Sequence, residues 1–302
     1  MSQHGIWIVD KPSGPTSHDI VAAARRQLGT RRVGHAGTLD PMASGVLVLL
    51  IGEATKLSDV ATSEDKAYVT DVCFGRATDS FDADGHTTAE AALADGWLDA
   101  ARLGRALDVE RQRREQVPPA ISAVKVGGQR SYRLAREGHA PELAPRPIVV
   151  HGLELLDWGS AFARLALRVS KGYYVRSLAR DLGLELGAPA HLSRLRRVRS
   201  GHFGIEEASA WPPTSVPVLV SLRDALPRLL PTARLTAHGV TRARQGKALS
   251  ASDFDDSSAI DAAEPDSTLA WTDAEGAPVA LGRREGDAYR VRRGFAAGAE
   301  LA

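Results

Sequence analysis

The chain has 302 residues, of which 43% are hydrophobic and 25% are charged, values that are ordinary for a soluble globular protein. No apolar run is as long as a membrane span, the N-terminus lacks signal-peptide features, and the single Cys73 excludes an internal disulfide. We therefore expect a cytoplasmic protein, without membrane association, that forms one large domain and a small one.

The net charge of +1 conceals an uneven distribution of charge along the chain. Residues 171–199 carry seven Lys and Arg against two acids, whereas residues 250–275 carry eight acids and no Lys or Arg. A face concentrated in arginine attracts phosphates even when the total charge is near zero. The alternative for residues 171–199 is a solvated charged helix.

The N-terminal segment predicts a strand and then a helix. Residues 5–12 (GIWIVDKP) indicate a strand that stops at its Lys-Pro pair. Ser17 is positioned to cap a helix, Asp19 lies in its first turn, and Gly29 ends it. The arginines on the polar side and at the exit of this helix, where a phosphate-bearing partner can meet them, are Arg25, Arg26, Arg31 and Arg32.

The stretch 33–53 (VGHAGTLDPMASGVLVLLIGE) combines a glycine-rich loop with a strand. The loop holds Asp40 before Pro41, and its glycines let another molecule approach because they carry no Cβ. The apolar run from Val46 to Ile51 predicts a buried strand. Asp40 is our candidate reactive group, and the alternative is ordinary Asp-Pro turn chemistry.

Residues 66–86 predict a strand followed by an acidic loop. The side chains of 66–75 (KAYVTDVCFG) alternate as those of a strand do. The following RATDSFDADGH (76–86) looks like a calcium loop. However, aligning it with the EF-hand pattern puts Ser80 and Ala91 where acidic ligands are required. We therefore reject a calcium site.

The rest of the chain predicts further helices, strands and a C-terminal unit. A helical stretch around Leu103 precedes a basic segment, 116–138, and strands are expected at 148–156 and 162–169. Prolines after residue 211 indicate that the first domain ends near residue 229. Residues 230–302 alternate short apolar runs with turns, as a small β-barrel does.

Several of these strings resemble, in the same order, the motifs of the TruB-type tRNA pseudouridine synthases. GHAGTLDPMASGVL (34–47) resembles the signature loop of that family, and DKPSGPTS (10–17) resembles the motif that opens its catalytic domain. Residues 117–138 resemble an RNA-binding insertion specific to the family. SKGYYVRSL (170–178) and AHLSRLRRVRSGHF (190–203) resemble two later motifs, with Tyr173 in place of the usual Thr.

The resemblance implies the fold and the domains. It implies an α+β pseudouridine synthase fold with a central mixed, mostly antiparallel sheet and flanking helices in residues 1–229. An RNA-binding insertion is expected at about 116–146. Residues 230–302 are similar to the family's PUA-like C-terminal module, a small β-barrel.

The resemblance also implies the activity. This is isomerisation of uridine to pseudouridine at position 55 in the T-loop of tRNAs, with Asp40 acting on a flipped-out uridine and with no cofactor or metal. The expected partner of this monomer is tRNA, bound at its T-stem-loop and, through the C-terminal module, at its acceptor end. Three roles for Asp40 stay open: an ester with C1′, addition to the base, or removal of a sugar proton.

Roles for other residues follow from the same motifs. The residues expected at the substrate are His35, Tyr68, Asp82, Tyr174, Arg176 and Leu195. The residues expected on the RNA are Lys125, Arg130, Tyr132, Arg133 and Arg136. Arg176 is our expected partner for the charge of Asp40, and His35 is expected to fill the space that the flipped base leaves.

Three rival functions deserve comparison. The same basic surface fits a non-catalytic tRNA-binding and folding chaperone, and the same chemistry fits a pseudouridine synthase acting on another RNA. A Ser-His-Asp hydrolase is disfavoured because no G-x-S-x-G elbow occurs. The variant Asp40→Asn separates the enzyme from the chaperone.

Overall fold

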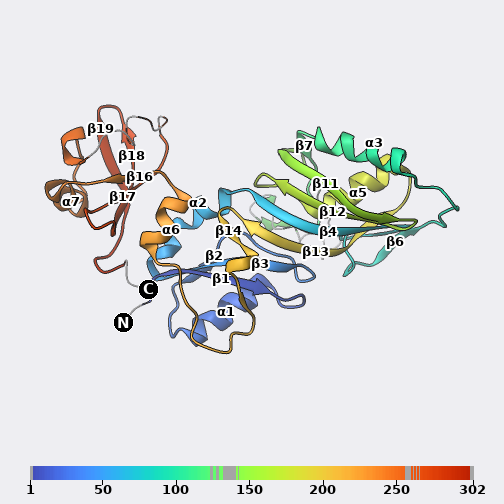
Figure 1. Ribbon diagram of the computed structural model, residues 1–302, viewed down its shortest axis with the longest axis horizontal. Coiled ribbons are helices and arrows are strands. Elements are labelled where there is room, and N and C mark those ends of the chain that lie inside the picture. The colour runs from blue at the N-terminus through green and yellow to red at the C-terminus, as the bar shows by residue number, and fades with distance from the viewer. Residues whose placement is uncertain are drawn as a thin grey trace.

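The computed structural model describes residues 3–122, 125–126, 129–131, 141, 143–255, 260, 262, 264 and 266–299. The molecule is elongated, with the C-terminal sheet at one end and the helix α3 (Ala100–Arg111) at the other (Figure 1). Among the described residues, no helix combines the length and the apolar character that a membrane span requires.

A nine-stranded sheet forms the centre of the molecule, in the order β11-β12-β4-β13-β3-β1-β15, with β14 added on β13 and β2 on β3. The β1/β15 and β3/β13 pairs are parallel and the other pairs are antiparallel. The predicted mixed, mostly antiparallel sheet is therefore confirmed. Its strands are β1 (Gly5–Lys11), β2 (Val33–His35), β3 (Ser44–Ile51), β4 (Lys66–Phe74), β11 (Val150–Gly159), β12 (Phe162–Val169), β13 (Ala190–Ser200), β14 (Phe203–Gly204) and β15 (Ser209–Ala210).

The helix α1 (Ser17–Gln27) forms as predicted, but its N-cap is Thr16 and not Ser17. The Thr16 hydroxyl accepts a hydrogen bond from the Asp19 N–H, and the Asp19 carboxylate accepts one from the Thr16 N–H. Ser17 is instead fully buried, and its hydroxyl bonds both the N–H and the C=O of Leu39. The first turn of α1 therefore holds the residue immediately before Asp40.

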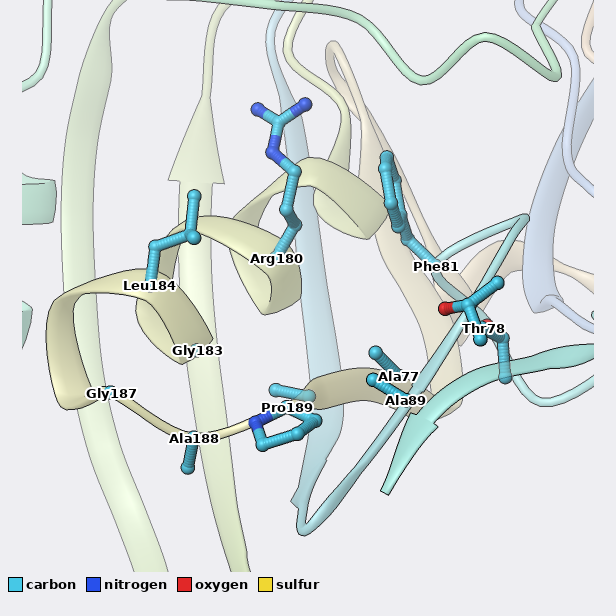
Figure 2. A pocket seen from close by; sticks show the side chains of 12 residues that line it. Ala77, Thr78, Phe81, Ala89, Arg180, Gly183, Leu184, Gly187, Ala188 and Pro189 are labelled. Atoms are coloured by element: carbon cyan, nitrogen blue, oxygen red, sulfur yellow. The ribbon is translucent and has the colours of Figure 1, made fainter. Parts of the chain in front are cut away.

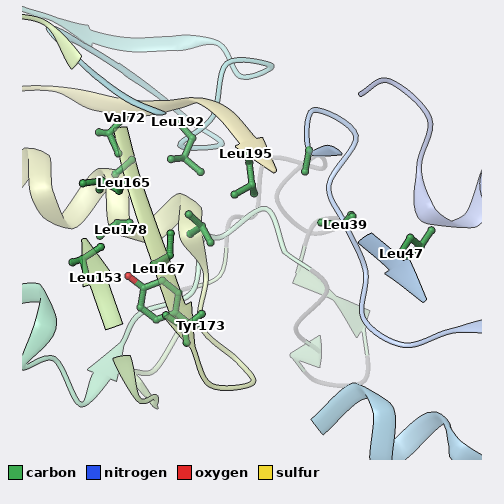
Figure 3. Packing of buried hydrophobic residues seen from close by; sticks show 14 of the residues in the cluster. Leu39, Leu47, Val72, Leu153, Leu165, Leu167, Tyr173, Leu178, Leu192 and Leu195 are labelled. Carbon is green, nitrogen blue, oxygen red and sulfur yellow. The ribbon is translucent and has the colours of Figure 1, made fainter. Parts of the chain in front are cut away.

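Two helices cover one half of the sheet. α3 and α5 (Val175–Leu186) pack on β4, β11, β12 and β13 through a shared apolar core. Figure 3 shows part of this core, with Leu165, Leu178 and Leu192 side by side. The predicted strands 148–156 and 162–169 correspond to β11 and β12.

A second core joins the other half of the sheet to the C-terminal part of the chain. It contains Val46 and Val48 of β3, Leu226 of α6 (Leu222–Leu229) and Leu281 and Phe295 from further along the chain. The smaller helix α2 (Ser58–Ser63) also packs here. The boundary at residues 229 and 230 stays a prediction.

The C-terminal part contains α7 (Ala237–Arg244) and a four-stranded sheet in the order β16-β17-β18-β19. The strands are β16 (Thr232–Arg234), β17 (Leu269–Thr272), β18 (Pro278–Glu285) and β19 (Ala288–Gly294). In the part of the chain that the structure describes, β16 and β19 do not pair with each other. A closed barrel is therefore not confirmed.

Among the described residues, three short two-stranded ladders stand outside the main sheet. β5 (Arg76–Thr78) pairs with β6 (Thr87–Glu90) and carries the acidic loop between them. β7 (Glu115–Gln116) pairs with β10 (Arg146–Pro147), and β8 (Lys125–Val126) pairs with β9 (Gln129–Arg130). The β7/β10 ladder thus brings together the two ends of the predicted insertion.

The basic segment 171–199 is divided between α5 and β13 and is not a single solvated helix. Arg176 and Arg197 are buried, and Arg196 forms an ion pair with Asp10 at 2.7 Å. These arginines do not form one exposed face. Sequence charge alone missed this because it does not report which arginines have internal partners.

A buried carboxylate links the C-terminal part to the large sheet. Glu53 is 2% exposed and accepts hydrogen bonds from Arg32 (2.6 Å), from Lys56 (2.5 Å) and from the Ala296 N–H (2.9 Å). Burial opposes its ionisation. The bonds from Lys56, Ala296 and Arg32 outweigh burial and lower the pKa of Glu53 from 4.5 to about 2.

We expect Glu53→Gln to lower the free energy of unfolding by about 2 kcal/mol at pH 7, because the amide loses charge-assisted bonds from three donors. A carboxylate with a lowered pKa stabilises the fold above pH 4.5, and this stabilisation is lost as the pH falls towards 2. Denaturant unfolding at several pH values measures both effects. The exposed Glu206, paired with Arg199, provides the control Glu206→Gln. An unchanged acid profile in Glu53→Gln would contradict this account.

Candidate active site

A cavity of about 280 Å³ opens beside the Asp40 loop. Its lining includes five of the predicted site residues, Asp40, Tyr68, Tyr174, Arg176 and Leu195. They come from separate parts of the chain: the loop before β3, the strands β4 and β13, and the start of α5. The fold thus brings together residues that lie in separate motifs of the sequence.

Asp40 and Arg176 form an ion pair in this cavity. The Arg176 Nε lies 2.9 Å from one carboxylate oxygen of Asp40, and an Nη donates to the other oxygen at 3.4 Å. The Asp40 side chain is 35% exposed, whereas that of Arg176 is 7% exposed. A partly exposed carboxylate therefore faces the cavity and is paired with a buried cation.

The Arg176 guanidinium is also bonded to the backbone of two other segments. It donates to the C=O of Ser80, in the β5/β6 loop, and to the C=O of Ile121, in the insertion, both at 2.9 Å. A first-turn arginine opposes the helix dipole of α5. The contacts of Arg176 with Asp40, Ser80 and Ile121 offset that cost. They place its guanidinium where the Asp40 loop, the β5/β6 loop and the insertion meet.

Asp82 lies behind this arginine and is not among the described residues that line the cavity. It is 5% exposed, it accepts a hydrogen bond from the Ser80 hydroxyl at 2.5 Å, and it lies 3.6 Å from Arg176 Nε. Burial raises the pKa of Asp82. From this position, Asp82 helps to fix the orientation of the Arg176 guanidinium.

His35 is the last residue of β2 and also lies outside the described lining of the cavity. Its ring meets the ring of His18 edge to face, with centroids 5.6 Å apart. Burial, His18 and Arg197 lower the pKa of His35 to about 4, so the ring is neutral at pH 7. Its Nδ1 is buried with no hydrogen-bond partner among the described residues.

Arg197 is a site residue that sequence reasoning did not single out. Its buried guanidinium donates to the C=O groups of Gly37 (3.0 Å), Thr38 (3.4 Å) and Val46 (2.7 Å). It therefore holds the Asp40 loop from both sides. Gly45 permits the close pairing of β3 with β13 at this point, because a Cβ there would clash with the backbone oxygen of Arg197.

Two buried lysines were also missed. Lys11 is fully buried and donates to the C=O groups of Pro12, Pro15 and Pro41. Lys66 lines the cavity and donates to the C=O groups of Thr62 and Glu64, at the end of α2. Burial lowers the pKa of each lysine to about 8. The only sequence signal for Lys11 was its place in the motif DKPSGPTS.

The predicted RNA-binding residues are described only in part. Lys125 and Arg130 lie opposite each other on β8 and β9. Tyr132, Arg133 and Arg136 lie outside the described residues.

A second cavity, of about 320 Å³, lies between α5 and the β5/β6 ladder (Figure 2). Small apolar residues form most of its walls, and no predicted site residue is among the described residues that line it.

The sequence matches known proteins of one family along most of its length. Residues 25–175 match the N-terminal domain of the TruB family pseudouridylate synthases, and residues 176–216 match a tRNA pseudouridylate synthase B C-terminal domain. A tRNA pseudouridine synthase B of Mycobacterium sp. (strain KMS) is 44% identical, over 88% of this chain and 90% of its own. The protein of the same name from Mycobacterium bovis (strain BCG / Pasteur 1173P2) is 40% identical, over 95% and 94%.

Solved structures show a similar fold. One, a Cbf5-Nop10-Gar1 complex, contains a chain that superposes with a TM-score of 0.73 at 24% identity, over 97% of this chain and 85% of that one. Another, an H/ACA RNP bound to a substrate RNA containing 2'-deoxyuridine, gives a TM-score of 0.72 at 22% identity, over 97% and 86%. Together with the matches along the sequence, these likenesses lead to one conclusion: the chain belongs to the TruB family of pseudouridylate synthases.

Proposed function

We propose that this chain isomerises uridine to pseudouridine at position 55 in the T-loop of tRNAs, with Asp40 as the catalytic residue. The observation that carries the proposal is the half-buried Asp40 carboxylate, which faces the cavity and pairs with Arg176 at 2.9 Å. When a bound base displaces water from the cavity, this guanidinium balances the charge that Asp40 needs in order to react.

The other lining residues suit a flipped-out uridine. Removing a base from its stack costs a few kcal/mol. Stacking on an aromatic ring such as Tyr68 returns about 1–3 kcal/mol per base. Tyr174 and Leu195 supply further contact area in the same cavity. His35 borders the loop and fills the space that the base leaves in the RNA.

The choice of RNA rests on the family and on the basic insertion. Its relatives are named for tRNA, and residues 116–146 interleave basic residues with Tyr132 in a composition suited to a stem-loop. Residues 230–302 form a PUA-like domain that contacts the acceptor end. In this proposal the protein acts as a cytoplasmic monomer, with its catalytic domain in residues 1–229.

Incubating the purified protein with an unmodified tRNA transcript, and mapping pseudouridine along it, tests the proposal. We expect conversion at position 55, and none at that position in a control transcript with cytidine there. Conversion only at other uridines, or only in RNAs other than tRNA, would overturn the assigned substrate. Tight tRNA binding with no conversion at all would favour the chaperone.

A further inference from the structure

Tyr173 differs from the Thr found in the motif that its segment resembles, and the structure gives it a specific partner. Its side chain lies in the core beside Leu167 (Figure 3) and is 8% exposed, and the residue also borders the cavity. Its hydroxyl donates to Glu110 of α3 at 2.8 Å. A Thr side chain is too short to place its hydroxyl where the end of the Tyr ring lies.

Glu110 is 1% exposed, and both of its oxygens are engaged. One accepts from Tyr173, and the other accepts from the Arg113 Nε at 2.5 Å. Arg113 in turn lies 3.8 Å from Asp181 of α5. Burial raises the pKa of Glu110, so these partners offset a desolvation cost. The Tyr173 ring cannot shift without unpairing this buried carboxylate.

Tyr173 stands in the short segment that delivers two side chains to the cavity. Tyr174 follows it as the N-cap of α5, and Arg176 lies in the first turn. A second hydrogen bond anchors the same segment. The Tyr174 N–H donates to the side-chain oxygen of Gln116 at 2.8 Å. The first bond joins the start of α5 to the last turn of α3, and the second joins it to β7, at the beginning of the insertion.

We propose that Tyr173 and Glu110 are positioning residues for the reaction. Their hydrogen bond holds the start of α5 so that the side chains of Tyr174 and Arg176 keep their positions relative to Asp40. The inference rests on the proposed function of the same cavity. A positioning role for Tyr173 can be distinguished from a packing role by experiment. A phenylalanine would fill the same space in the core but could not form the hydrogen bond that fixes the start of α5.

The test compares variants that keep or remove this bond. Tyr173→Phe and Glu110→Met remove it, whereas Glu110→Gln keeps a carbonyl oxygen that can accept it. We expect the first two to lower kcat for pseudouridine formation about tenfold with KM within about twofold, since small misplacements of reacting groups cost rate. Glu110→Gln should retain most of kcat. The matched control is Asp108→Asn, an exposed carboxylate paired with Arg111 on the same helix.

A double variant separates positioning from general damage. If the two residues act as one unit, Tyr173→Phe combined with Glu110→Met should be no slower than the slower single variant. Wild-type kcat in Tyr173→Phe, equal losses in Glu110→Gln and Glu110→Met, or multiplicative losses in the double variant would each overturn the inference. Circular dichroism and thermal unfolding verify that every variant is folded. An inactive wild-type protein would count against the proposed function instead.

Discussion

Asp40→Asn is expected to lower the rate of pseudouridine formation on tRNA by about 10³-fold or more, because the neutral amide can act neither as a nucleophile nor as a base. Asn has nearly the same shape, and the Asp40 side chain is 35% exposed, so the fold should tolerate the change. Arg176 loses the charge of Asp40 but keeps Asp82 at 3.6 Å and the C=O groups of Ser80 and Ile121.

Rapid quenching and quantification of pseudouridine measure this loss, and a titration with labelled tRNA measures binding. We expect the dissociation constant of Asp40→Asn to stay within about threefold of the wild-type value, because phosphate contacts dominate the affinity for RNA. The control is Asp95→Asn, which changes an exposed carboxylate in a loop. Wild-type turnover in Asp40→Asn, or a loss of binding in step with turnover, would contradict the assigned role.

Arg176→Lys is expected to lower kcat by about 10²-fold although the charge is retained, because misplacing a reacting carboxylate by about 1 Å has effects of this size. The guanidinium is a planar fork that contacts Asp40, Ser80 and Ile121 together. An ammonium group is a compact point charge and cannot reproduce that geometry. In Arg176→Lys, the contacts that hold Asp40, Ser80 and Ile121 together are therefore weakened.

The same kinetic assay applies, with Arg180→Lys as the matched control. Arg180 lies one turn further along α5 and also donates to the insertion, at the C=O of Val117, but it is not among the described residues that line the Asp40 cavity. Its variant should lose less than about threefold in kcat, the scale of a surface contact. Comparable losses in both variants would show that contact with the insertion, and not the pairing with Asp40, is what matters.

Much of the fold could be predicted from local patterns. The alternation in 66–75 and the apolar run 46–51 specify strands because period-two patterning follows from strand geometry. The expected pairing of Asp40 with Arg176 came from motifs and not from periodicity, and the two residues do lie 2.9 Å apart. They are 136 positions apart in the chain, so no local rule could have joined them.

The buried cations could not be predicted in this way. Lys11, Lys66 and Arg197 resemble surface residues in any hydropathy analysis, since unpaired charges avoid the interior. Lys11 and Arg197 donate to the C=O groups of Pro41 and Gly37, in the Asp40 loop, which reach them only in the folded protein. Lys66 donates to the C=O groups of Thr62 and Glu64, which are close to it in the chain, and periodicity does not indicate these bonds either. The N-cap of α1 is Thr16 for a related reason. The hydroxyl of Ser17 is hydrogen-bonded to Leu39, which is distant in the chain, and so it does not cap the helix.

The contact that shapes the Asp40 loop has a consequence for protein synthesis. Arg197 reaches the Val46 C=O across 151 positions of the chain, through the parallel contact of β13 with β3. Closing so long a segment costs entropy, and non-local pairings of this kind form slowly. We therefore expect the Asp40 loop of a newly made chain to reach its final conformation only after residue 197 has left the ribosome.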